Sequence, residues 1–215
     1  MSGTYKIKEA FLTLQGEGAQ TGRPAVFCRF TGCNLWSGRE KDRVDAVCTF
    51  CDTDFVGTDG HNGGRFESAD ALADHLWALW SGHVLGGGEP MIVFTGGEPA
   101  LQLDAALIES CRIRGFRLSI ETNGTLELPD LIDWICVSPK SNAPLKVTRG
   151  DELKLVFPQP DCLPDTVAQL PFSHYFLQPM DGPNGSENLQ ATIAYCLKNP
   201  QWRLSLQTHK LIGID

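Results

Sequence analysis

Short apolar runs alternate with amphipathic stretches along most of this chain. Runs rich in Val, Ile, Leu and Phe, bounded by Gly, Pro, Asn or Asp, are typical of β-strands. They predict strands at residues 5–14, 25–30, 91–95, 117–121, 134–138, 152–157, 174–178 and 203–207. Elsewhere, apolar residues recur with the period of an α-helix, which predicts helices at 69–80, 103–114 and 187–198.

Two of the predicted helices carry end signals. Leu72, Leu76 and Leu79 share one face of the first helix, and Ser68 directly before it suits an N-cap. Gly115 suits the left-handed residue that ends the second helix. Strands that alternate with helices predict an α/β fold with a mainly parallel sheet and right-handed crossovers.

The length of the chain limits how far such a sheet can close. A complete eight-stranded barrel typically takes about 250 residues. This chain has 215, enough for one domain, and residues 32–65 read as a loop region. We therefore expect a single domain, 1–215, built as a modified, incomplete TIM-like (β/α) barrel with an expanded loop inside it.

Composition excludes several classes of function. A net charge of −8 argues against a broad basic surface for nucleic acid. No run approaches the roughly 20 apolar residues of a membrane helix, and the start of the chain lacks the apolar core of a secretory signal. We expect a cytoplasmic protein with neither nucleic acid nor a membrane as a partner.

Polar residues repeatedly follow the ends of the predicted strands. In a parallel barrel these ends share one edge, where the active site forms. Each group alone suits a turn, because Gly, Pro and Asn favour turns, but five on one edge indicate a site. The groups are 95–98, 121–124, 138–140, 178–181 and 207–209.

Three of the eight cysteines, Cys33, Cys48 and Cys51, stand among glycines and polar residues, as ligands on a loop would. The other five lie in apolar segments and are typical of buried hydrophobic residues. Three thiolates would leave one iron of a cubane cluster open to another ligand. A zinc loop completed by Cys28 or His61 explains the spacing equally well.

Gly96, Gly97, Glu98 and Pro99 favour the cluster over zinc. Two glycines directly after a strand expose main-chain groups that a ligand can approach closely. Glu98 would offer a carboxylate to a cationic amine. Taken alone, the same four residues would suit an ordinary turn between a strand and a helix.

Together these motifs resemble the radical S-adenosylmethionine enzymes. Their usual signature has three cysteines, separated by three and two residues, with an aromatic residue before the third. Here Phe50 precedes Cys51, but fourteen residues, 34–47, replace the gap of three. This departure resembles the 7-carboxy-7-deazaguanine synthases, which include versions with expanded cluster loops. The resemblance covers nearly the whole chain, through motifs at 14–18, 29–35, 51–55, 95–99, 121–124, 138–140 and 178–181.

The resemblance implies a specific reaction. Such enzymes contract 6-carboxy-5,6,7,8-tetrahydropterin to 7-carboxy-7-deazaguanine with loss of ammonia, on the route to queuosine. It implies a 4Fe–4S cluster, S-adenosylmethionine and Mg²⁺ as cofactors. It also implies a flavodoxin or ferredoxin-type electron donor and a homodimer.

The resemblance also implies roles for individual residues. Cys33, Cys48 and Cys51 would hold the cluster, and Thr53 would bind Mg²⁺. The S-adenosylmethionine contacts would be Phe50, Cys51, Asp52, Gly97, Glu98, Glu121, Asn123, Ser138, Pro139, Lys140, Gln178, Pro179, Met180 and Asp181. The substrate contacts would be Leu14, Gln15, Gly16, Glu17, Arg29, Thr95, His209 and the C-terminal Asp215.

Some of these residues have plainer interpretations. Arg29 suits a substrate carboxylate because its planar fork makes bidentate pairs, yet it also suits a structural ion pair. Thr53 would serve equally in a turn, and a lone His209 would serve structurally. Residues 34–47 suit either a solvated insertion or a docking surface. Two other functions share the cysteine pattern: a radical activase that acts on a glycine of a partner protein, and a zinc-stabilised binding module.

Overall fold

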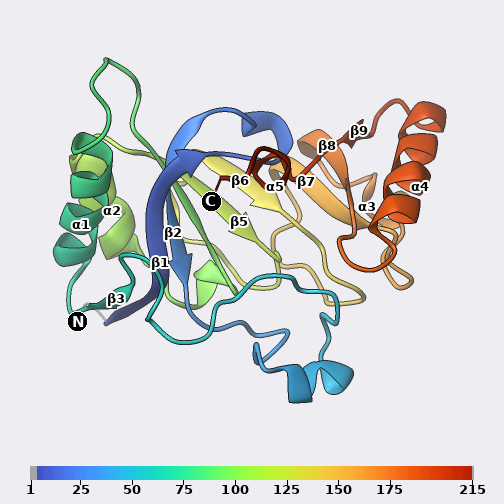
Figure 1. Cartoon of the computed structure of the whole chain (residues 1–215), viewed down its shortest axis with the longest axis horizontal. Coiled ribbons are helices and arrows are strands. Elements are labelled where there is room, and N and C mark those ends of the chain that lie inside the picture. The colour runs from blue at the N-terminus through green and yellow to red at the C-terminus, as the bar shows by residue number, and fades with distance from the viewer. Residues whose placement is uncertain (1–3, 215) are drawn as a thin grey trace.

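One nine-stranded sheet organises the protein, in a computed structural model that describes residues 4–214 (Figure 1). The strand order is β3-β1-β2-β4-β5-β6-β7-β8-β9. Strands β2 and β4 to β9 run parallel, and β1 pairs antiparallel with β2 and β3. The strands are β1 (Tyr5–Leu14), β2 (Pro24–Phe30), β3 (Gly64–Phe66), β4 (Met91–Gly96), β5 (Arg117–Thr122), β6 (Trp134–Val137), β7 (Gly150–Phe157), β8 (Phe172–Pro179) and β9 (Arg203–Leu204).

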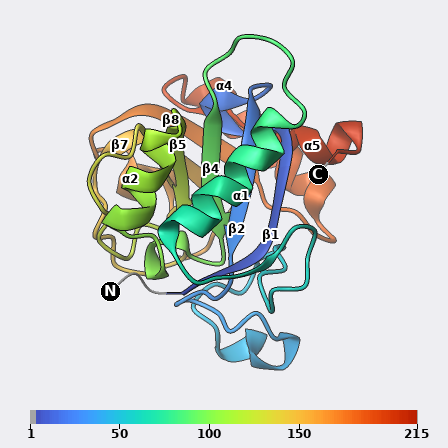
Figure 2. The same ribbon diagram turned by 90° about the vertical axis from the view of Figure 1, so that its left-hand side faces the viewer.

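Helices cover the outside of this sheet at its two ends. Figure 2 shows α1 and α2 side by side over one end, and Figure 1 shows α4 at the other. The helices are α1 (Ala69–Ser81), α2 (Ala105–Ile113), α3 (Pro164–Val167), α4 (Gly185–Lys198) and α5 (Thr208–Ile212). Three 3₁₀ turns are η1 (Gly18–Gln20), η2 (Glu40–Asp45) and η3 (Pro99–Leu101).

The sheet stays open, which confirms the prediction of an incomplete TIM-like α/β barrel. Its edges, β3 and β9, do not pair with each other. The crossovers from β5 to β6 and from β6 to β7 contain no helix among the described residues. The sequence predicted the strand β1 but not its antiparallel direction, and it did not predict the short β3.

The predicted elements agree with the structure except at the start of the second helix and near the C-terminus. Ser68 caps α1 by accepting a hydrogen bond from the Ala71 N–H (3.1 Å), and Gly115 after α2 has φ +85°. The second helix begins later than predicted, because Asp104 caps it through the Leu107 N–H (3.0 Å). The predicted strand at 203–207 is wrong beyond Leu204: the chain leaves the sheet and enters α5.

Two apolar clusters stabilise the outer face of the sheet. The larger one joins α1 and α2 to β1, β2, β4 and β5 and includes Leu72, Leu76 and Phe94. The second joins β7 and β8 to the helices near them and includes Leu155 and Trp202. The two clusters thus lie at the two ends of the sheet, and the strands in the middle of the sheet are covered less by helices.

Strand alternation turns another set of side chains to the inner face. On this face, Ala25, Met91 and Val93 pack into a small apolar plug with Phe27. Successive side chains on one strand point to opposite faces. Polar residues continue the same rows toward the carboxyl ends of the strands, namely Arg29, Thr95, Glu121, Ser138, Lys154 and Gln178.

Loops that are hydrogen-bonded to one another cover the open side of the sheet. The Thr208 N–H and hydroxyl both donate to the Gly16 carbonyl (2.9 and 2.8 Å), and the Gly18 N–H donates to the Ser205 hydroxyl (2.9 Å). The loop after β1 therefore meets the segment after β9 beside α5. In the part of the chain that the structure describes, none of the helices is long and apolar enough for a membrane span.

Candidate active site

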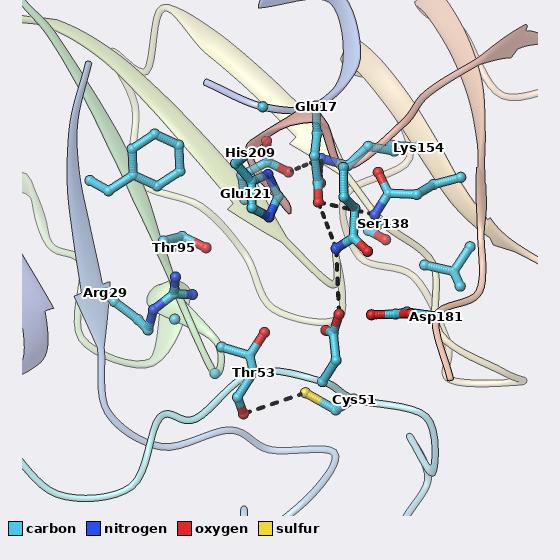
Figure 3. Close-up of a pocket in the computed structure, with 18 of the residues that line it drawn as sticks. Glu17, Arg29, Cys51, Thr53, Thr95, Glu121, Ser138, Lys154, Asp181 and His209 are labelled. Atoms are coloured by element: carbon cyan, nitrogen blue, oxygen red, sulfur yellow. Dashed lines mark hydrogen bonds and ion pairs between the residues drawn. The ribbon is translucent and has the colours of Figure 1, made fainter. Parts of the chain in front are cut away.

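A cavity of about 420 Å³ lies at the carboxyl ends of the parallel strands (Figure 3). Strand ends, the loop after β1, the cysteine loop and α5 all contribute to its walls. The predicted site residues that line it are Leu14, Gln15, Gly16, Glu17, Arg29, Cys48, Phe50, Cys51, Asp52, Thr53, Thr95, Gly97, Glu121, Asn123, Ser138, Lys140, Gln178, Pro179, Met180, Asp181 and His209.

Three of the predicted residues that the structure describes do not line this cavity. Cys33 lies behind Gly97, and Glu98 is fully buried. The Pro139 carbonyl accepts a hydrogen bond from Gln159 Nε2 (3.1 Å). Asp215 lies outside the described residues, so its predicted substrate contact stays a prediction.

The three clustered cysteines lie near one another at one side of the cavity. Burial raises the pKa of the Cys33 thiol and of the Cys48 thiol, and the nearby Cys51 raises both further. The Leu35 N–H points at the Cys33 sulfur (3.4 Å). Three soft donors on one loop, with two facing the cavity, have the chemistry that suits an iron–sulfur cluster. Among the described residues, however, no three His, Cys, Asp or Glu side chains are already arranged to hold a metal ion.

Close packing fixes the position of the paired glycines beside these cysteines. A Cβ on Gly97 would lie 2.1 Å from the Gly32 carbonyl oxygen and 2.9 Å from the Cys33 Cβ. Gly96 has φ +147° and would place a Cβ 2.3 Å from the Phe30 carbonyl oxygen. Only glycine fits at either position, and the main chain of β4 therefore approaches the cysteine loop directly.

The carboxylate of Glu98 points into the protein. It accepts hydrogen bonds from the Thr122 hydroxyl (2.7 Å), the Asn123 N–H (2.7 Å) and the Ala100 N–H (3.0 Å). Burial raises its pKa above the ordinary value. Glu98 thus joins the end of β4 to the end of β5 and holds Asn123, and its predicted contact with a cationic amine stays a prediction.

The loop between Cys33 and Cys48 folds back on itself. The guanidinium of Arg43 lies over the Trp36 ring (4.0 Å) and donates to the carbonyls of Thr49 (2.9 Å) and Cys51 (3.1 Å). Trp36 in turn packs edge-on against Phe55. This loop therefore has its own small apolar centre, and Arg43 links that centre to the cysteine pair.

Arg29 forms the structural ion pair that was one of its predicted interpretations and also lines the cavity. Its Nε–H donates to Glu9 (2.7 Å), an ion pair that fixes the guanidinium. The same side chain lines the cavity beside Thr95, its pairing partner on β4, and near Thr53 (Figure 3). A guanidinium held in this way keeps its remaining N–H groups for an anionic ligand.

Polar side chains from three loops gather at the mouth. Lys140 Nζ donates to the Ser138 hydroxyl (2.8 Å) and lies 5.5 Å from the centre of the Phe50 ring. Lys210 Nζ from α5 bridges Asp52 (2.8 Å) and Asp181 (2.6 Å). The cysteine loop, the turn after β8 and the C-terminal helix are thus tied together.

His209 reaches the cavity from α5 rather than from a strand end. A Cβ on Gly16 would lie 2.2 Å from the His209 Nδ1, so the ring packs on a position where only glycine fits. Burial lowers the pKa of His209, although Glu17 opposes that effect. The neutral ring beside Glu17 and Glu121 (Figure 3) can accept or donate a hydrogen bond.

Several functional-looking residues escaped the sequence motifs. They are Glu9, Lys154 and Lys210, all in the cavity wall. Strand alternation could have found Lys154, because Glu152 and Lys154 occupy the inward positions of an otherwise apolar run. No local signal marks Lys210, which follows a strand that ends early.

Comparison with known proteins adds a close match over almost the full length. No family model matches the chain. It is 62% identical over 210 residues to the 7-carboxy-7-deazaguanine synthase of Bordetella pertussis, covering 98% of this chain and 99% of that protein. The corresponding protein of Caulobacter vibrioides is 60% identical over 211 residues, with the same coverage. The chain belongs to the 7-carboxy-7-deazaguanine synthase family.

A solved structure supports the same assignment. The crystal structure of QueE from Escherichia coli matches with a TM-score of 0.68 and 27% identity, covering 94% of this chain and 93% of that one. Members of the 7-carboxy-7-deazaguanine synthase family are enzymes, so the zinc-stabilised binding module is set aside. The resemblance that rested on motifs is confirmed by identity over nearly the whole chain.

Proposed function

We propose that the protein is a 7-carboxy-7-deazaguanine synthase that converts 6-carboxy-5,6,7,8-tetrahydropterin to 7-carboxy-7-deazaguanine with loss of ammonia. Identity of 62% over 98% of the chain to a synthase of that name carries the proposal. The cavity supports it, because three cysteines stand at one side and a fixed guanidinium at another.

Cys33, Cys48 and Cys51 would hold a 4Fe–4S cluster. With S-adenosylmethionine bound to its open iron, the cluster would supply the 5′-deoxyadenosyl radical that removes a hydrogen atom from the pterin. The main chain at Gly97 and the side chain of Asn123 would bind the methionine end. Asn123 Nδ2 is held by Asn34 (3.0 Å), which keeps its amide oriented at the edge of the cavity.

The nucleoside end of S-adenosylmethionine would lie at the mouth. Phe50 offers an apolar ring beside Lys140, and Ser138 offers a hydroxyl. Pro179 and Met180 give an apolar wall, and the carboxylate of Asp181 can accept from ribose hydroxyls. Together these groups suit a flat base joined to a polar sugar.

The substrate would lie deeper, against the loop after β1. Arg29 would bind the pterin carboxylate with the N–H groups that Glu9 leaves unused. Thr53 would offer its hydroxyl to a Mg²⁺ ion whose other ligands are substrate oxygens and water, as suits a hard cation. Leu14, Gln15, Gly16 and Thr95 would surround the ring.

We propose the remaining features from the family resemblance. The electron donor would be a flavodoxin or ferredoxin-type protein, the enzyme a homodimer, and the place of action the cytoplasm. The exposed apolar side chains of α5, Leu211 and Ile212, are available for contact with another protein surface.

One experiment tests the proposed reaction. Protein reconstituted anaerobically with iron and sulfide should turn over 6-carboxy-5,6,7,8-tetrahydropterin when supplied with reductant, S-adenosylmethionine and Mg²⁺. The product, 7-carboxy-7-deazaguanine, is measured by chromatography with mass detection. Absence of the product from protein with a verified cluster would refute the proposal. A radical activase would instead cleave S-adenosylmethionine without consuming the pterin.

A further inference from the structure

Lys154 on β7 is a buried cation in the wall of the cavity. Its side chain is only 4% exposed. Strand alternation places it on the inner face of the sheet, whereas its neighbours in sequence, Leu153 and Leu155, point into the outer core. A buried ammonium is strongly unfavourable unless partners compensate its charge. The groups that compensate it therefore indicate its role.

Two carboxylates compensate this charge, and both line the cavity. Lys154 Nζ lies 2.7 Å from Glu17 Oε2 and 2.9 Å from Glu121 Oε2. Glu17 belongs to the loop after β1, and Glu121 to the end of β5. One ammonium therefore fixes two acidic side chains from opposite parts of the sheet, as Figure 3 shows.

The second oxygen of each carboxylate is also held. Glu17 Oε1 accepts from Gln178 Nε2 (3.1 Å) and Gln207 Nε2 (3.1 Å), and Glu121 Oε1 accepts from Gln15 Nε2 (3.2 Å). A carboxylate has about four acceptor positions. Each group is thus fixed in orientation and still has capacity to accept from a ligand.

The surrounding groups favour the ionised form of Glu17. Burial raises the pKa of Glu17, but Lys154 and its other donors more than reverse this and lower it. Burial raises the pKa of Glu152, the third carboxyl group nearby, which favours its neutral form. Two carboxylates then share one ammonium, and this end of the cavity is left with an excess of negative charge.

The two ends of the cavity therefore differ in chemistry. Arg29 and Thr95 lie on one side in Figure 3, and Glu17, Glu121 and Lys154 on another. A carboxylated pterin has the matching polarity, with an anionic group at one end and adjacent N–H donors of an aminopyrimidinone at the other.

We propose that Lys154 is a positioning residue that holds Glu17 and Glu121 as a fixed pair of acceptors for the N–H edge of the aminopyrimidinone ring. This inference rests on the proposed function and assigns Glu121 to the substrate rather than to S-adenosylmethionine. Lys154 itself is covered by the two carboxylates and acts through them.

The test is Lys154→Met in anaerobically reconstituted holoenzyme. Each charge-assisted hydrogen bond lost from a ligand weakens binding about tenfold or more. We expect the KM for the pterin to rise at least about tenfold and the KM for S-adenosylmethionine to change less than about twofold. An unchanged pterin KM, or an equal rise in both KM values, would overturn the proposal.

Two further variants separate positioning from general destabilisation. Lys154→Arg keeps the cation and should restore part of the pterin affinity that Lys154→Met loses. Arg114→Met is the matched control, because Arg114 also bridges two carboxylates, Asp70 and Asp74, but on the helices outside the sheet. It should leave both KM values unchanged.

A triple variant decides the matter if Lys154→Met does not fold. Lys154→Met with Glu17→Gln and Glu121→Gln removes the ammonium together with both carboxylates, so no uncompensated charge is left among these three groups. If Lys154 acts only through the two carboxylates, the triple variant should bind the pterin within about twofold of the Glu17→Gln, Glu121→Gln protein. A further loss of affinity in the triple variant would show that Lys154 acts independently, against the proposal.

Binding measured without turnover keeps the two proposals distinguishable. The aromatic analogue 6-carboxypterin is titrated by fluorescence into wild-type and variant holoenzyme with S-adenosylmethionine present. Failure of wild-type protein to form product would refute the proposed function. Normal wild-type turnover together with undiminished 6-carboxypterin binding by Lys154→Met would refute only the role of Lys154.

Discussion

Two glycines beside the cavity are required by what packs against them. Gly16 leaves the space that the His209 ring occupies, and Gly97 leaves the space between β4 and Cys33. Neither has the positive φ that usually explains a glycine in a turn. Their role is therefore to let one part of the main chain approach a functional side chain of another.

Gly97→Ala should weaken the seat of the cluster. The added Cβ would lie 2.1 Å from the Gly32 carbonyl oxygen, so the cysteine loop must move. We expect overpacking to cost about 1–3 kcal/mol of unfolding free energy. Iron content after reconstitution, and cleavage of S-adenosylmethionine, should both fall.

Gly86→Ala is the control for that variant. Gly86 lies on an exposed loop, and a Cβ added there would meet no heavy atom within 4 Å. The Gly86→Ala protein should retain normal iron content. A Gly97→Ala protein with wild-type iron content and cleavage would contradict the packing argument.

At the residue scale, the sequence predicted positions better than contacts. Cys48, Thr53 and Arg29 were found because each stands in a short motif, and the structure brings them to one cavity. Glu98 was expected to face a ligand, yet two donors at the end of β5 and the nearby Ala100 N–H hold its carboxylate inside. Two of those donors come from residues distant in sequence, so no local pattern could reveal them.

At the scale of elements, the crossover from β5 to β6 lacks a helix and depends on side chains. Asp133 accepts from Arg112 Nη1 (2.8 Å) and from the Leu118 N–H (2.8 Å), which ties the end of this loop to α2 and β5. Burial alone would raise the pKa of Asp133, but the hydrogen bonds and charge of Arg112 lower it.

Asp133→Ala should destabilise the protein in a pH-dependent way. Loss of these hydrogen bonds should cost about 1–3 kcal/mol at pH 7. The pKa of Asp133 is lower in the folded than in the unfolded state, so its contribution is complete above about 3.9 and is lost as pH falls through the folded value. Urea unfolding of wild type and variant at several pH values measures the difference.

The exposed Asp130 in the same crossover provides the control. Asp130→Ala should change stability by less than about 0.5 kcal/mol at any pH. If the difference in unfolding free energy between Asp133→Ala and wild type stayed constant into strong acid, the ionised pair of Asp133 with Arg112 would be contradicted.

Helix α5 is attached largely by polar contacts at the mouth. Lys210 bridges Asp52 and Asp181 with side chains that are 42%, 44% and 50% exposed. Exposed ion pairs stabilise a protein by at most about 1 kcal/mol each. The contacts of Lys210 therefore matter more for holding α5 in place than for global stability.

Lys210→Met should loosen α5 without unfolding the protein. We expect faster amide exchange at residues 208–214 and a rise of about two- to tenfold in the KM for S-adenosylmethionine. Hydrogen exchange with mass detection and steady-state kinetics measure these effects. Lys198→Met, in the last turn of α4, should affect neither. Unchanged exchange at α5 would show that other contacts suffice.

The sequence missed α5 because its signals are weak. A five-residue helix has no full hydrophobic period, and here it follows a strand of two residues. The long strands and helices α1 and α2 were predictable because they bury a continuous apolar face, whereas α4 buries Thr192 and only part of Tyr195 and Cys196. The antiparallel β1 was not, because direction depends on partners that alternation alone does not identify.

At the scale of the whole molecule, the cluster loop lies apart from both outer cores. Leu35, Trp36 and Phe55 are buried, but none belongs to the clusters that join the helices to the sheet. Loss of the cluster should therefore unfold this loop locally and leave the barrel intact.

Cys51→Ala tests this separation. The variant should lose bound iron and S-adenosylmethionine cleavage, keep its far-ultraviolet circular dichroism, and show faster exchange only around residues 33–55. Cys196→Ala, on the half-buried face of α4, should keep its iron. Global loss of secondary structure in Cys51→Ala would show that the cluster also stabilises the sheet.

On the open side of the barrel, hydrogen bonds between loops take the place of a strand pair, so this side can separate more easily than the wall of a closed barrel. A closed barrel must distort a ladder of paired strands to widen its mouth, whereas here Thr208 and Ser205 hold the loop after β1 by a few hydrogen bonds. If these hydrogen bonds broke, α5 and His209 would move away together while every strand pair of the sheet stayed formed. Gln207 Nε2 also donates to Glu17 Oε1 (3.1 Å), so movement of this segment would also remove one of the hydrogen bonds that orient Glu17.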